Sequence, residues 1–347
     1  MTNNKTIYIT LTFGLFAVVL FSLGLGAMYI PVLDVITILA KKMEIINFTA
    51  ADDLAENVLL YVRLPRIILG LLVGAALGIS GAAIQGIFRN PLAEPGLIGI
   101  SAGASLFAVL IIGMESLLLV SLSELLGFYL LAFGAFAGAG LAAMSVYQFS
   151  RTDGKPNVAT MLLAGIAINA LAGALTGLLT YTADEQQLRT ITFWMLGSLG
   201  GANWDMIIGI TPFILIPLFL LPLYGKGLNL FAIGEHQAEQ IGMNPQKIKN
   251  RVVILSTLAV GACVSVTGII GFVGLLVPHI VRMIGGADHR LVLPASALLG
   301  ALVLTVSDLL ARILAAPVEL PIGVITALLG APVFLYILYK DKKKILQ

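Results

Sequence analysis

Long apolar stretches, separated by short polar segments, follow one another along the whole chain. Because a helix needs about 20 apolar residues to cross the hydrocarbon core, the pattern predicts about ten membrane-spanning helices. They are expected at residues 7–30, 64–88, 96–113, 125–148, 158–182, 206–224, 252–268, 272–286, 291–311 and 320–339. We therefore expect an all-α, polytopic membrane protein whose residues 1–347 form a single transmembrane domain.

Composition excludes a water-soluble fold. Hydrophobic residues make up 59% of the chain and charged residues only 11%, which is roughly half of the charged fraction of an average soluble domain. The apolar residues must therefore face lipid and neighbouring helices.

Two segments between the predicted spans are richer in polar residues than ordinary connectors. Residues 31–62 carry several charges among apolar positions, and we interpret them as one or two short helices on the outer surface. Residues 225–251 form the longest predicted inward loop, in which Glu235 to Gly242 resembles a short helix ended by glycine. A soluble partner could bind this loop on the cytoplasmic side.

The distribution of basic residues predicts the orientation. With a cytoplasmic N-terminus, the inward segments hold 14 of the 20 basic residues, which agrees with the positive-inside bias and with an even number of helices. Those inward residues are Lys5, Arg89, Arg151, Lys155, Lys226, Lys247, Lys249, Arg251, Arg282, Arg290, Lys340, Lys342, Lys343 and Lys344. We therefore expect both termini in the cytoplasm.

Small residues indicate how the helices associate, because lipid provides no hydrophobic drive between them. Glycines four residues apart should be buried in helix packing or, alternatively, line a flexible gate. The sets are Gly70, Gly74 and Gly78, then Gly134 and Gly138, then Gly173 and Gly177.

A short internal similarity also suggests an inverted repeat. Residues 96–100 (GLIGI) open the third span, and residues 268–272 (GIIGF) precede the eighth. The odd number of helices between them is what two halves of opposite orientation would give.

Motifs for catalysis are missing from the sequence. Gly154-Lys155 is followed by proline, so no ATP-binding P-loop is encoded, and neither a zinc-protease motif nor a nucleophile elbow occurs. The single cysteine, Cys263, cannot form an intramolecular disulfide. We expect a chain that is not an enzyme, that holds no metal or cofactor, and that has no nucleic-acid partner.

Charged residues fall mostly at the predicted helix ends, which argues against an ion-coupled carrier with ionisable groups at mid-membrane depth. Asp308 and Arg312 are the main exception; they lie one turn apart near the outer end of the ninth span and can pair with each other. The ion-coupled alternative is weakened but stays open.

Two arginines, Arg63 and Arg66, open the second span on the outer side, against the general charge trend. They are expected to point outward, where they either reach lipid phosphates or bind carboxylates of an external protein or ligand.

On the inner side, the segment from Asn90 to Gly96 contains two prolines and should form a tight turn that also suits a gate hinge.

Several motifs in sequence order resemble one family, the bacterial permeases that import iron-siderophores, haem and cobalamin (the FecCD and BtuC-like ABC permeases). The resemblance extends from about residue 63 to residue 340. The matching segments are residues 63–66 (RLPR), 81–86 (GAAIQG), 89–101 (RNPLAEPGLIGIS), 194–199 (WMLGSL), 234–242, 271–282, 319–323 (ELPIG) and 330–334 (GAPVF).

The resemblance implies a homodimer of ten-helix subunits in the bacterial plasma (inner) membrane, with the substrate path along the dimer axis. Two copies of a separate ATP-binding subunit would dock on the cytoplasmic side, and a substrate-binding protein would dock outside. It further implies docking of the binding protein by Arg63, Arg66 and Arg312. By the same match, the ATPase-coupling residues are Gly234, Glu235, Ala238 and Gly242, and the residues of the inner gate are Asn90 and Leu92.

The substrate is less well defined by the sequence. Arg89 before Asn90 resembles the haem and siderophore branches more than the cobalamin branch, and the Phe193-Trp194 segment favours haem. We therefore expect an importer permease for haem or a ferric siderophore. The alternatives are a cobalamin importer of the same architecture, an ion-coupled secondary transporter, and a membrane scaffold or receptor without transport.

Overall fold

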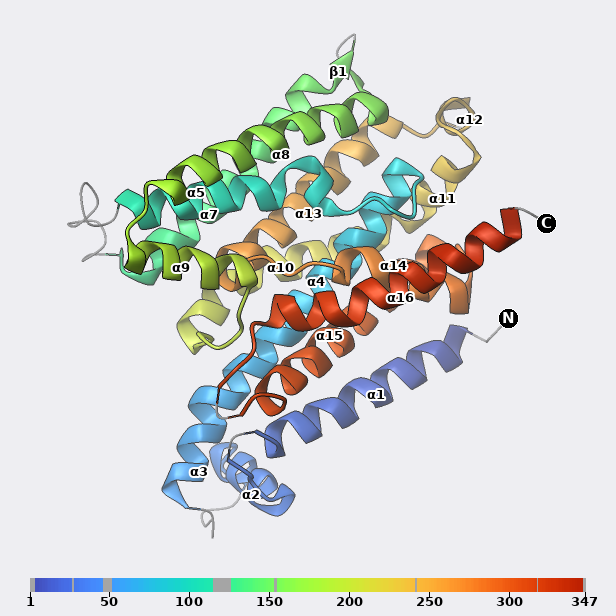
Figure 1. Cartoon of the computed structure of the whole chain (residues 1–347). Coiled ribbons are helices and arrows are strands. Elements are labelled where there is room, and N and C mark those ends of the chain that lie inside the picture. The colour runs from blue at the N-terminus through green and yellow to red at the C-terminus, as the bar shows by residue number, and fades with distance from the viewer. Residues whose placement is uncertain are drawn as a thin grey trace.

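The computed structural model describes residues 4–26, 28–45, 52–114, 126–152, 155–240, 242–316 and 318–345. These residues form an elongated bundle of helices, with both ends of the chain at one end of the bundle (Figure 1). The larger helices are α1 (Asn4–Gly24), α4 (Leu64–Phe88), α5 (Ile100–Met114), α7 (Phe128–Phe149), α8 (Val158–Tyr181), α10 (Trp204–Leu220), α13 (Pro245–Thr267), α14 (Val273–Gly285), α15 (His289–Ile313) and α16 (Ile322–Ile345). The shorter elements are α2 (Val32–Lys42), α3 (Asp53–Asn57), η1 (Val58–Arg63), η2 (Pro95–Ile98), β1 (Arg151–Thr152), β2 (Lys155–Pro156), α9 (Glu185–Leu196), η3 (Leu221–Tyr224), α11 (Gly225–Ile233) and α12 (Glu235–Gln240).

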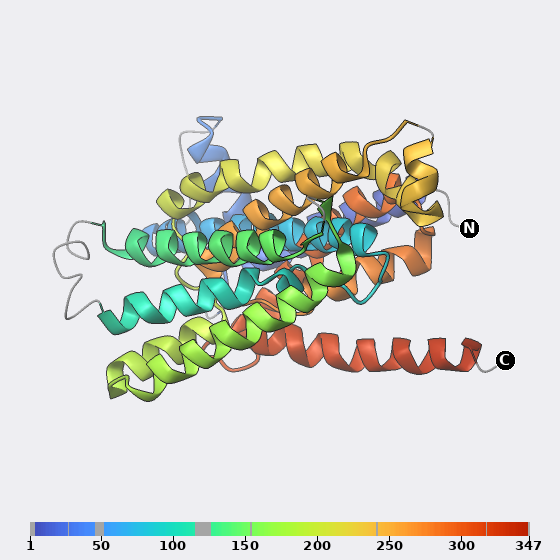
Figure 2. The ribbon, with the colours of Figure 1, turned by 90° about the horizontal axis from the view of Figure 1, so that it is seen from above.

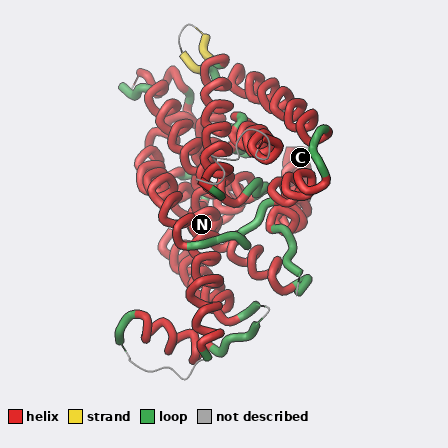
Figure 3. The backbone as a smooth tube through the Cα atoms, turned by 90° about the vertical axis from the view of Figure 1, so that its left-hand side faces the viewer, coloured by secondary structure: helices red, strands yellow, loops and turns green. Residues whose placement is uncertain are grey.

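The predicted all-α polytopic fold is confirmed. Within the described residues, seven helical stretches are long and apolar enough to cross a membrane, and α5, α14 and the apolar part of α16 are three shorter apolar helices. Strand structure in the described part of the chain is limited to one two-stranded hairpin, β1–β2, at the edge of the bundle (Figure 3). Ten helices thus occupy the ten predicted spans.

The outer segment predicted at residues 31–62 is partly wrong. The helix α2 is a separate short helix, but α3 and η1 run without a break into α4, so that one helix extends from Asp53 to Phe88. Pro65 does not interrupt this helix, because it lies in the first turn of α4 and follows the π-helical turn η1, where the regular hydrogen-bond pattern is already replaced.

The loop predicted at residues 225–251 is also shorter than expected. The spanning helix continues through η3 and α11 to Ile233, and α13 already begins at Pro245. Gly225 has helical backbone angles rather than ending the helix. A Cβ there would lie 3.1 Å from the backbone nitrogen of Arg290, so this glycine allows α11 to pack closely on α15. The short helix predicted from Glu235 is present as α12.

The core is built around α4, which contacts α15, α13, α14 and α10. Two of its glycines lie directly on the backbone of α15: a Cβ on Gly74 would collide with the Gly300 carbonyl oxygen, and one on Gly78 with the Ser296 carbonyl oxygen. These contacts confirm the packing predicted for this face. Seen from above, α10 and α13 lie along one long side of the molecule, and α8 and α16 lie along the other (Figure 2).

The other predicted glycine pairs have different outcomes. Gly138 in α7 is pressed against the Gly103 carbonyl oxygen in α5, and Gly134 against the side chain of Ile111, as expected. For Gly173 and Gly177 in α8, nothing lies within 4 Å of the position that an added Cβ would take, so the prediction that they are buried in packing within this chain is wrong. In α8 only Met161, Gly165, Ala172 and Thr176 are buried, and its small-residue face is open.

The two similar motifs make matching contacts. Gly165 in α8 lies against the carbonyl oxygen of Leu97 in the first motif. Gly323 in α16 lies near the carbonyl oxygen of Ile269 in the second, 3.1 Å from an added Cβ. In each motif, the carbonyl oxygen of the second residue contacts a helix that lies two spans further along the chain. This correspondence supports the internal repeat suggested by the sequence.

Candidate functional site

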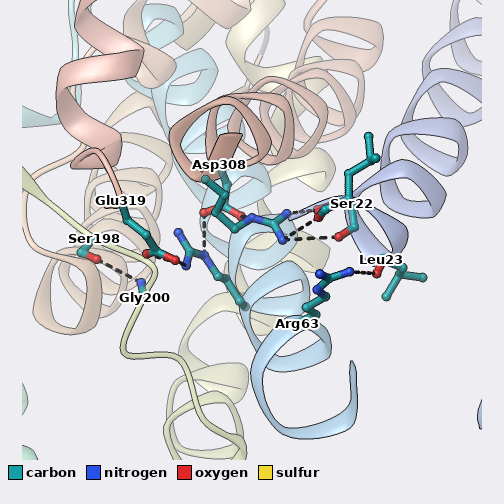
Figure 4. A network of polar contacts seen from close by, with 10 residues as sticks. Ser22, Leu23, Arg63, Ser198, Gly200, Asp308 and Glu319 are labelled. Carbon is teal, nitrogen blue, oxygen red and sulfur yellow. Dashed lines mark hydrogen bonds and ion pairs between the residues drawn. The ribbon is translucent and has the colours of Figure 1, made fainter. Parts of the chain in front are cut away.

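Three arginines meet at the end of the bundle that lies opposite the chain termini, where α1, α4 and α15 converge (Figure 4). The Arg66 Nε–H donates to Asp308 Oδ1 at 2.8 Å, and its Nη1 donates to both oxygens of Glu319 at 2.7 Å. The other oxygen of Asp308 pairs with Arg312 Nε at 3.1 Å. The predicted pairing of Asp308 with Arg312 is therefore present, within a larger cluster.

Arg63 has a different set of partners. It donates to the carbonyl oxygens of Leu23 at 2.6 Å and Gly24 at 2.9 Å, and also to that of Met28. The carbonyls of Leu23 and Gly24 lie at the C-terminal end of α1, which the guanidinium group caps, and that of Met28 lies in the segment that follows the helix. Arg312 reaches the same helix end through the hydroxyl and carbonyl of Ser22. Both arginines thus fix α1 to the bundle.

The structure places Arg63, Arg66 and Arg312 together but not at the surface: they are 4%, 5% and 7% exposed. Docking of a binding protein by these residues stays a prediction, and in this conformation the two arginines of the second span are buried. Their guanidinium groups turn inward because the Asp308 carboxylate and the carbonyls of α1 neutralise and solvate them there. The Glu319 side chain is 48% exposed, so the cluster is accessible from outside on the side where Glu319 lies.

A second group of residues surrounds α12, at the end of the bundle that holds both termini (Figure 1). Gly234 and Gly242 flank this helix with φ angles of +133° and +83°, which favour glycine. Ala238 is buried, and its carbonyl oxygen accepts from the Met243 N–H at 3.1 Å in the turn that ends the helix. The four predicted coupling residues therefore define one compact turn-helix-turn unit.

Glu235 fastens this unit to the membrane domain. Its Oε2 accepts from Lys249 Nζ in α13 at 2.6 Å, and the same Nζ lies 3.4 Å from the carbonyl oxygen of Pro156 in β2. Lys249 is only 3% exposed, so this is a largely buried pair. Hollows of about 570 and 550 Å³ beside it share the polar residues Arg89 and Gln246.

The inner turn after α4 has the predicted form. Arg89 ends the helix with a left-handed φ of +49°, and Asn90 Oδ1 accepts from the Leu92 N–H at 2.9 Å. The Gly96 carbonyl accepts from Asn169 Nδ2 at 3.1 Å, which ties the turn to α8. Within this turn, burial raises the pKa of Glu94. The role of Asn90 and Leu92 as an inner gate stays a prediction.

Sequence reasoning missed two members of these clusters. Lys249 lies among three basic residues at the start of α13, and only helical phase distinguishes it: Val252, Val253 and Ser256 follow on the same buried face. Glu319 belongs to a motif used for the family resemblance, but no local signal connects it with Arg66, which lies 253 residues away.

The comparison with protein families decides the identity of the chain. The sequence model of the FecCD transport family matches residues 14–340. The chain belongs to the FecCD transport family. Its relatives are transport permeases, and this FecCD chain is accordingly a multi-pass membrane permease of an ABC importer.

The names of individual relatives of this FecCD permease report different transported substrates. It is 46% identical over 296 residues to the hemin transport system permease protein HmuU of Yersinia pestis, covering 85% of this chain and 87% of the relative. It is 38% identical to the uncharacterized ABC transporter permease protein YvrB of Bacillus subtilis, covering 98% and 96% of the two chains. It is 39% identical to the cobalamin import system permease protein BtuC of Halobacterium salinarum, covering 82% and 74%.

A solved structure agrees with this assignment. The FecCD chain superimposes with a TM-score of 0.83 and 32% identity on a structure described as an inward-facing conformation of a metal-chelate type ABC transporter. The match covers 97% of this chain and 100% of the other. The fold and the family are therefore established, whereas the cargo differs among the relatives.

Proposed function

We propose that this FecCD permease imports an iron chelate, with haem as the preferred cargo, across the bacterial inner membrane. The observation that carries the proposal is the 46% identity to a hemin permease over most of both chains, compared with 39% to a cobalamin permease. Arg89 before Asn90 and the Phe193-Trp194 segment favour the same cargo. The working unit in this proposal is a homodimer with two ATP-binding subunits on the cytoplasmic side and a binding protein outside.

The open face of α8 supports a path shared by two copies. Gly173 and Gly177 border a hollow of about 470 Å³, which Ser105 in α5 and Met195 in α9 also line. Thr176, whose buried hydroxyl has no hydrogen-bond partner in the described residues, lies in the same lining. A face of small and hydroxyl-bearing residues that this chain leaves uncovered suits a pathway that a second subunit completes.

The two clusters suit the two partners. In our proposal the ATP-binding subunit binds α12. The contact of Lys249 with Glu235 transmits the movement of α12 to α13, and the contact of Lys249 with Pro156 transmits it to the β1–β2 hairpin before α8. The Arg66 cluster receives carboxylates of the binding protein. Glu319, the exposed carboxylate on Arg66, occupies the position that such a carboxylate would take and has to move aside during docking.

The docking proposal is tested with two substitutions in the purified transporter. Glu319→Gln removes the internal competitor and should strengthen association of the binding protein by about five-fold, whereas Arg66→Gln should weaken it at least as much. Arg189→Gln, an exposed arginine outside the cluster, is the control. Unchanged association in both cluster variants, with the permease and ATPase still assembled, would remove Arg66 and Glu319 from the docking site.

A cobalamin importer of the same architecture is the second candidate, because the relatives include cobalamin permeases at 39% identity. Competition between labelled haem and cobalamin for uptake separates the two. An ion-coupled carrier is less well supported, since the carboxylate of Asp308 is held between two arginines rather than open to an ion.

A further inference from the structure

A groove runs between α7 and α13 on the outside of the bundle. Its volume is about 560 Å³, and it belongs to the side of the molecule formed by α10 and α13, whereas α8 and α16 lie on the other long side (Figure 2). It therefore lies away from the open face assigned to the second subunit. The residues that line it are Phe136, Gly140, Ala143, Met144, Tyr147, Gln148, Arg151, Asn250, Val253, Ile254, Thr257 and Leu258.

Small residues on α7 create the groove. Gly140 has nothing within 4 Å of the position of an added Cβ, and Ala143, the next small residue of the lining, carries only a methyl group. One end is closed by Phe136, whose ring lies 5.4 Å from that of Phe213 in α10. Val253 and Ile254 of α13 form part of the opposite wall. For most of its length the lining of the groove is thus apolar, with the exception of Thr257, whose buried hydroxyl has no hydrogen-bond partner in the described residues.

The other end is polar and positively charged. The Arg151 guanidinium lies 5.5 Å from the centre of the Tyr147 ring, and the Tyr147 hydroxyl donates to Asn250 Oδ1 at 2.6 Å. Gln148 adds an amide at the same end. In the part of the chain that the structure describes, Arg151 forms no ion pair with a carboxylate. Among the described residues, the guanidinium thus packs against an aromatic ring but has no carboxylate partner.

The dimensions fit one lipid chain with its head group. Along α7, the thirteen steps from Phe136 to Phe149 correspond to about 20 Å at 1.5 Å per residue. One leaflet of the hydrocarbon core is about 15 Å thick, so a groove of this length holds an acyl chain and also reaches the head-group region. Arg151 lies just after the end of α7, at the depth where phosphates are expected.

We propose that this groove is a binding site for an anionic phospholipid. One acyl chain lies along Gly140 and Ala143, and the phosphate accepts hydrogen bonds from Arg151 and Gln148. Positively charged recesses between spanning helices bind anionic head groups in this manner.

The contact of Lys249 with Pro156 places the β1–β2 hairpin, and with it Arg151, on the side of the membrane that holds α12. The lipid therefore belongs to the leaflet beneath which the ATP-binding subunit is proposed to dock. The lipid site requires only that the chain spans a membrane, so it does not depend on the cargo.

The test is native mass spectrometry of the purified permease after exchange into phosphatidylglycerol or phosphatidylcholine with identical acyl chains. We expect the wild-type permease to retain one phosphatidylglycerol about five-fold more strongly than phosphatidylcholine, the preference that one interfacial cation provides. Arg151→Gln should abolish this preference. Gly140→Leu, which fills the groove, should reduce retention of both lipids.

Two further variants keep the test decisive. The Arg189 guanidinium also lies over an aromatic ring, 5.9 Å from the centre of that of Phe193, but Arg189 does not line the groove. Arg189→Gln should therefore leave lipid retention unchanged. Ile254→Trp fills the groove from α13 and replaces Gly140→Leu if that variant does not fold. Equal retention of both lipids by the wild type, or an unchanged preference in Arg151→Gln, would overturn the proposal. Dissociation of a dimer by the groove-filling variants, without loss of lipid, would show instead that a second copy covers this groove.

Discussion

At the scale of single residues, Asp308 connects two of the three arginines of the Arg66 cluster. Its carboxylate is 2% exposed and lies 2.8 Å from Arg66 and 3.1 Å from Arg312. Glu319 supplies a second negative charge to Arg66, while Arg63 is solvated by carbonyl oxygens of α1. Two carboxylates thus face three guanidinium groups, and the carbonyl oxygens of α1 stabilise the remaining positive charge, which allows the cluster to stay buried at the end of a membrane domain.

Removing the central carboxylate should therefore be costly. We expect Asp308→Asn to lower the free energy of unfolding by about 3–5 kcal/mol, because two buried guanidinium groups lose their shared partner. The loss is measured as a shift in thermal unfolding of the purified permease. Lys41→Gln is the control, since the partly exposed pair of Lys41 with Glu56 should contribute less than about 1 kcal/mol. Equal losses in the two variants would contradict the structural role of Asp308.

The sequence identified Arg63, Arg66 and Arg312 but not their burial. An arginine at the start of an apolar helix is normally exposed or snorkels to the interface, and nothing near Arg66 in the sequence changes that expectation. Its partners, Asp308 and Glu319, are 242 and 253 residues away. Asp308 reaches it through the packing of α15 on α4, and Glu319 reaches it from the segment between α15 and α16. Tertiary contacts of this range lie beyond what local pattern can predict.

At the scale of elements, the close approach of α4 to α15 depends on glycine. A Cβ on Gly78 would collide with the backbone of Ser296, and the helix axes would have to separate. The periodicity of small residues predicted this contact correctly. It failed for Gly173 and Gly177, because spacing alone does not distinguish a face that packs within the chain from one left open.

This difference gives a matched pair of substitutions. Gly78→Ala should destabilise the permease by about 1–3 kcal/mol through overpacking, whereas Gly177→Ala, in open space, should not lower stability and should stabilise the helix slightly. Thermal unfolding in the same detergent compares them. A harmless Gly78→Ala would mean that the backbones of α4 and α15 are not in direct contact at this position.

The link between α12 and the membrane domain is a second feature at this scale. Lys249→Met should detach Glu235 from α13 and reduce transport per ATP hydrolysed by about ten-fold, within the range of typical coupling free energies. Lys247→Gln, an exposed lysine one half-turn away, should have little effect. Reconstituted transporter supplies both rates. Normal coupling in Lys249→Met would exclude this lysine from the path of transmission.

Hydrophobic pattern located the helices but not all of their ends. It predicted residues 158–182 almost as the structure has them, and it placed the end of the second span correctly at residue 88. It missed the continuation of α4 back to Asp53 and of α10 forward to Ile233. In both places proline or glycine suggested a break, and a π-helical turn or close packing against α15 allowed the helix to continue.

At the scale of the whole molecule, the two clusters lie at opposite ends of the bundle, and the open face of α8 lies on one long side between them. This arrangement suits an importer whose outer end receives a loaded binding protein and whose other end receives an ATPase. The family membership was accessible from sequence because several motifs occur in order. The cargo was not, because the relatives share the fold and differ in the ligand that their names report.

The central claim is ATP-driven import of an iron chelate, and uptake in matched cells with and without this gene tests it most directly. Labelled haem, ferric siderophores and cobalamin are supplied separately, before and after depletion of ATP. We predict that loss of the gene abolishes uptake of haem, or of one ferric siderophore, and that ATP depletion has the same effect. Loss of cobalamin uptake alone would contradict the proposed cargo, and gene-dependent uptake that persists without ATP would contradict the importer mechanism itself.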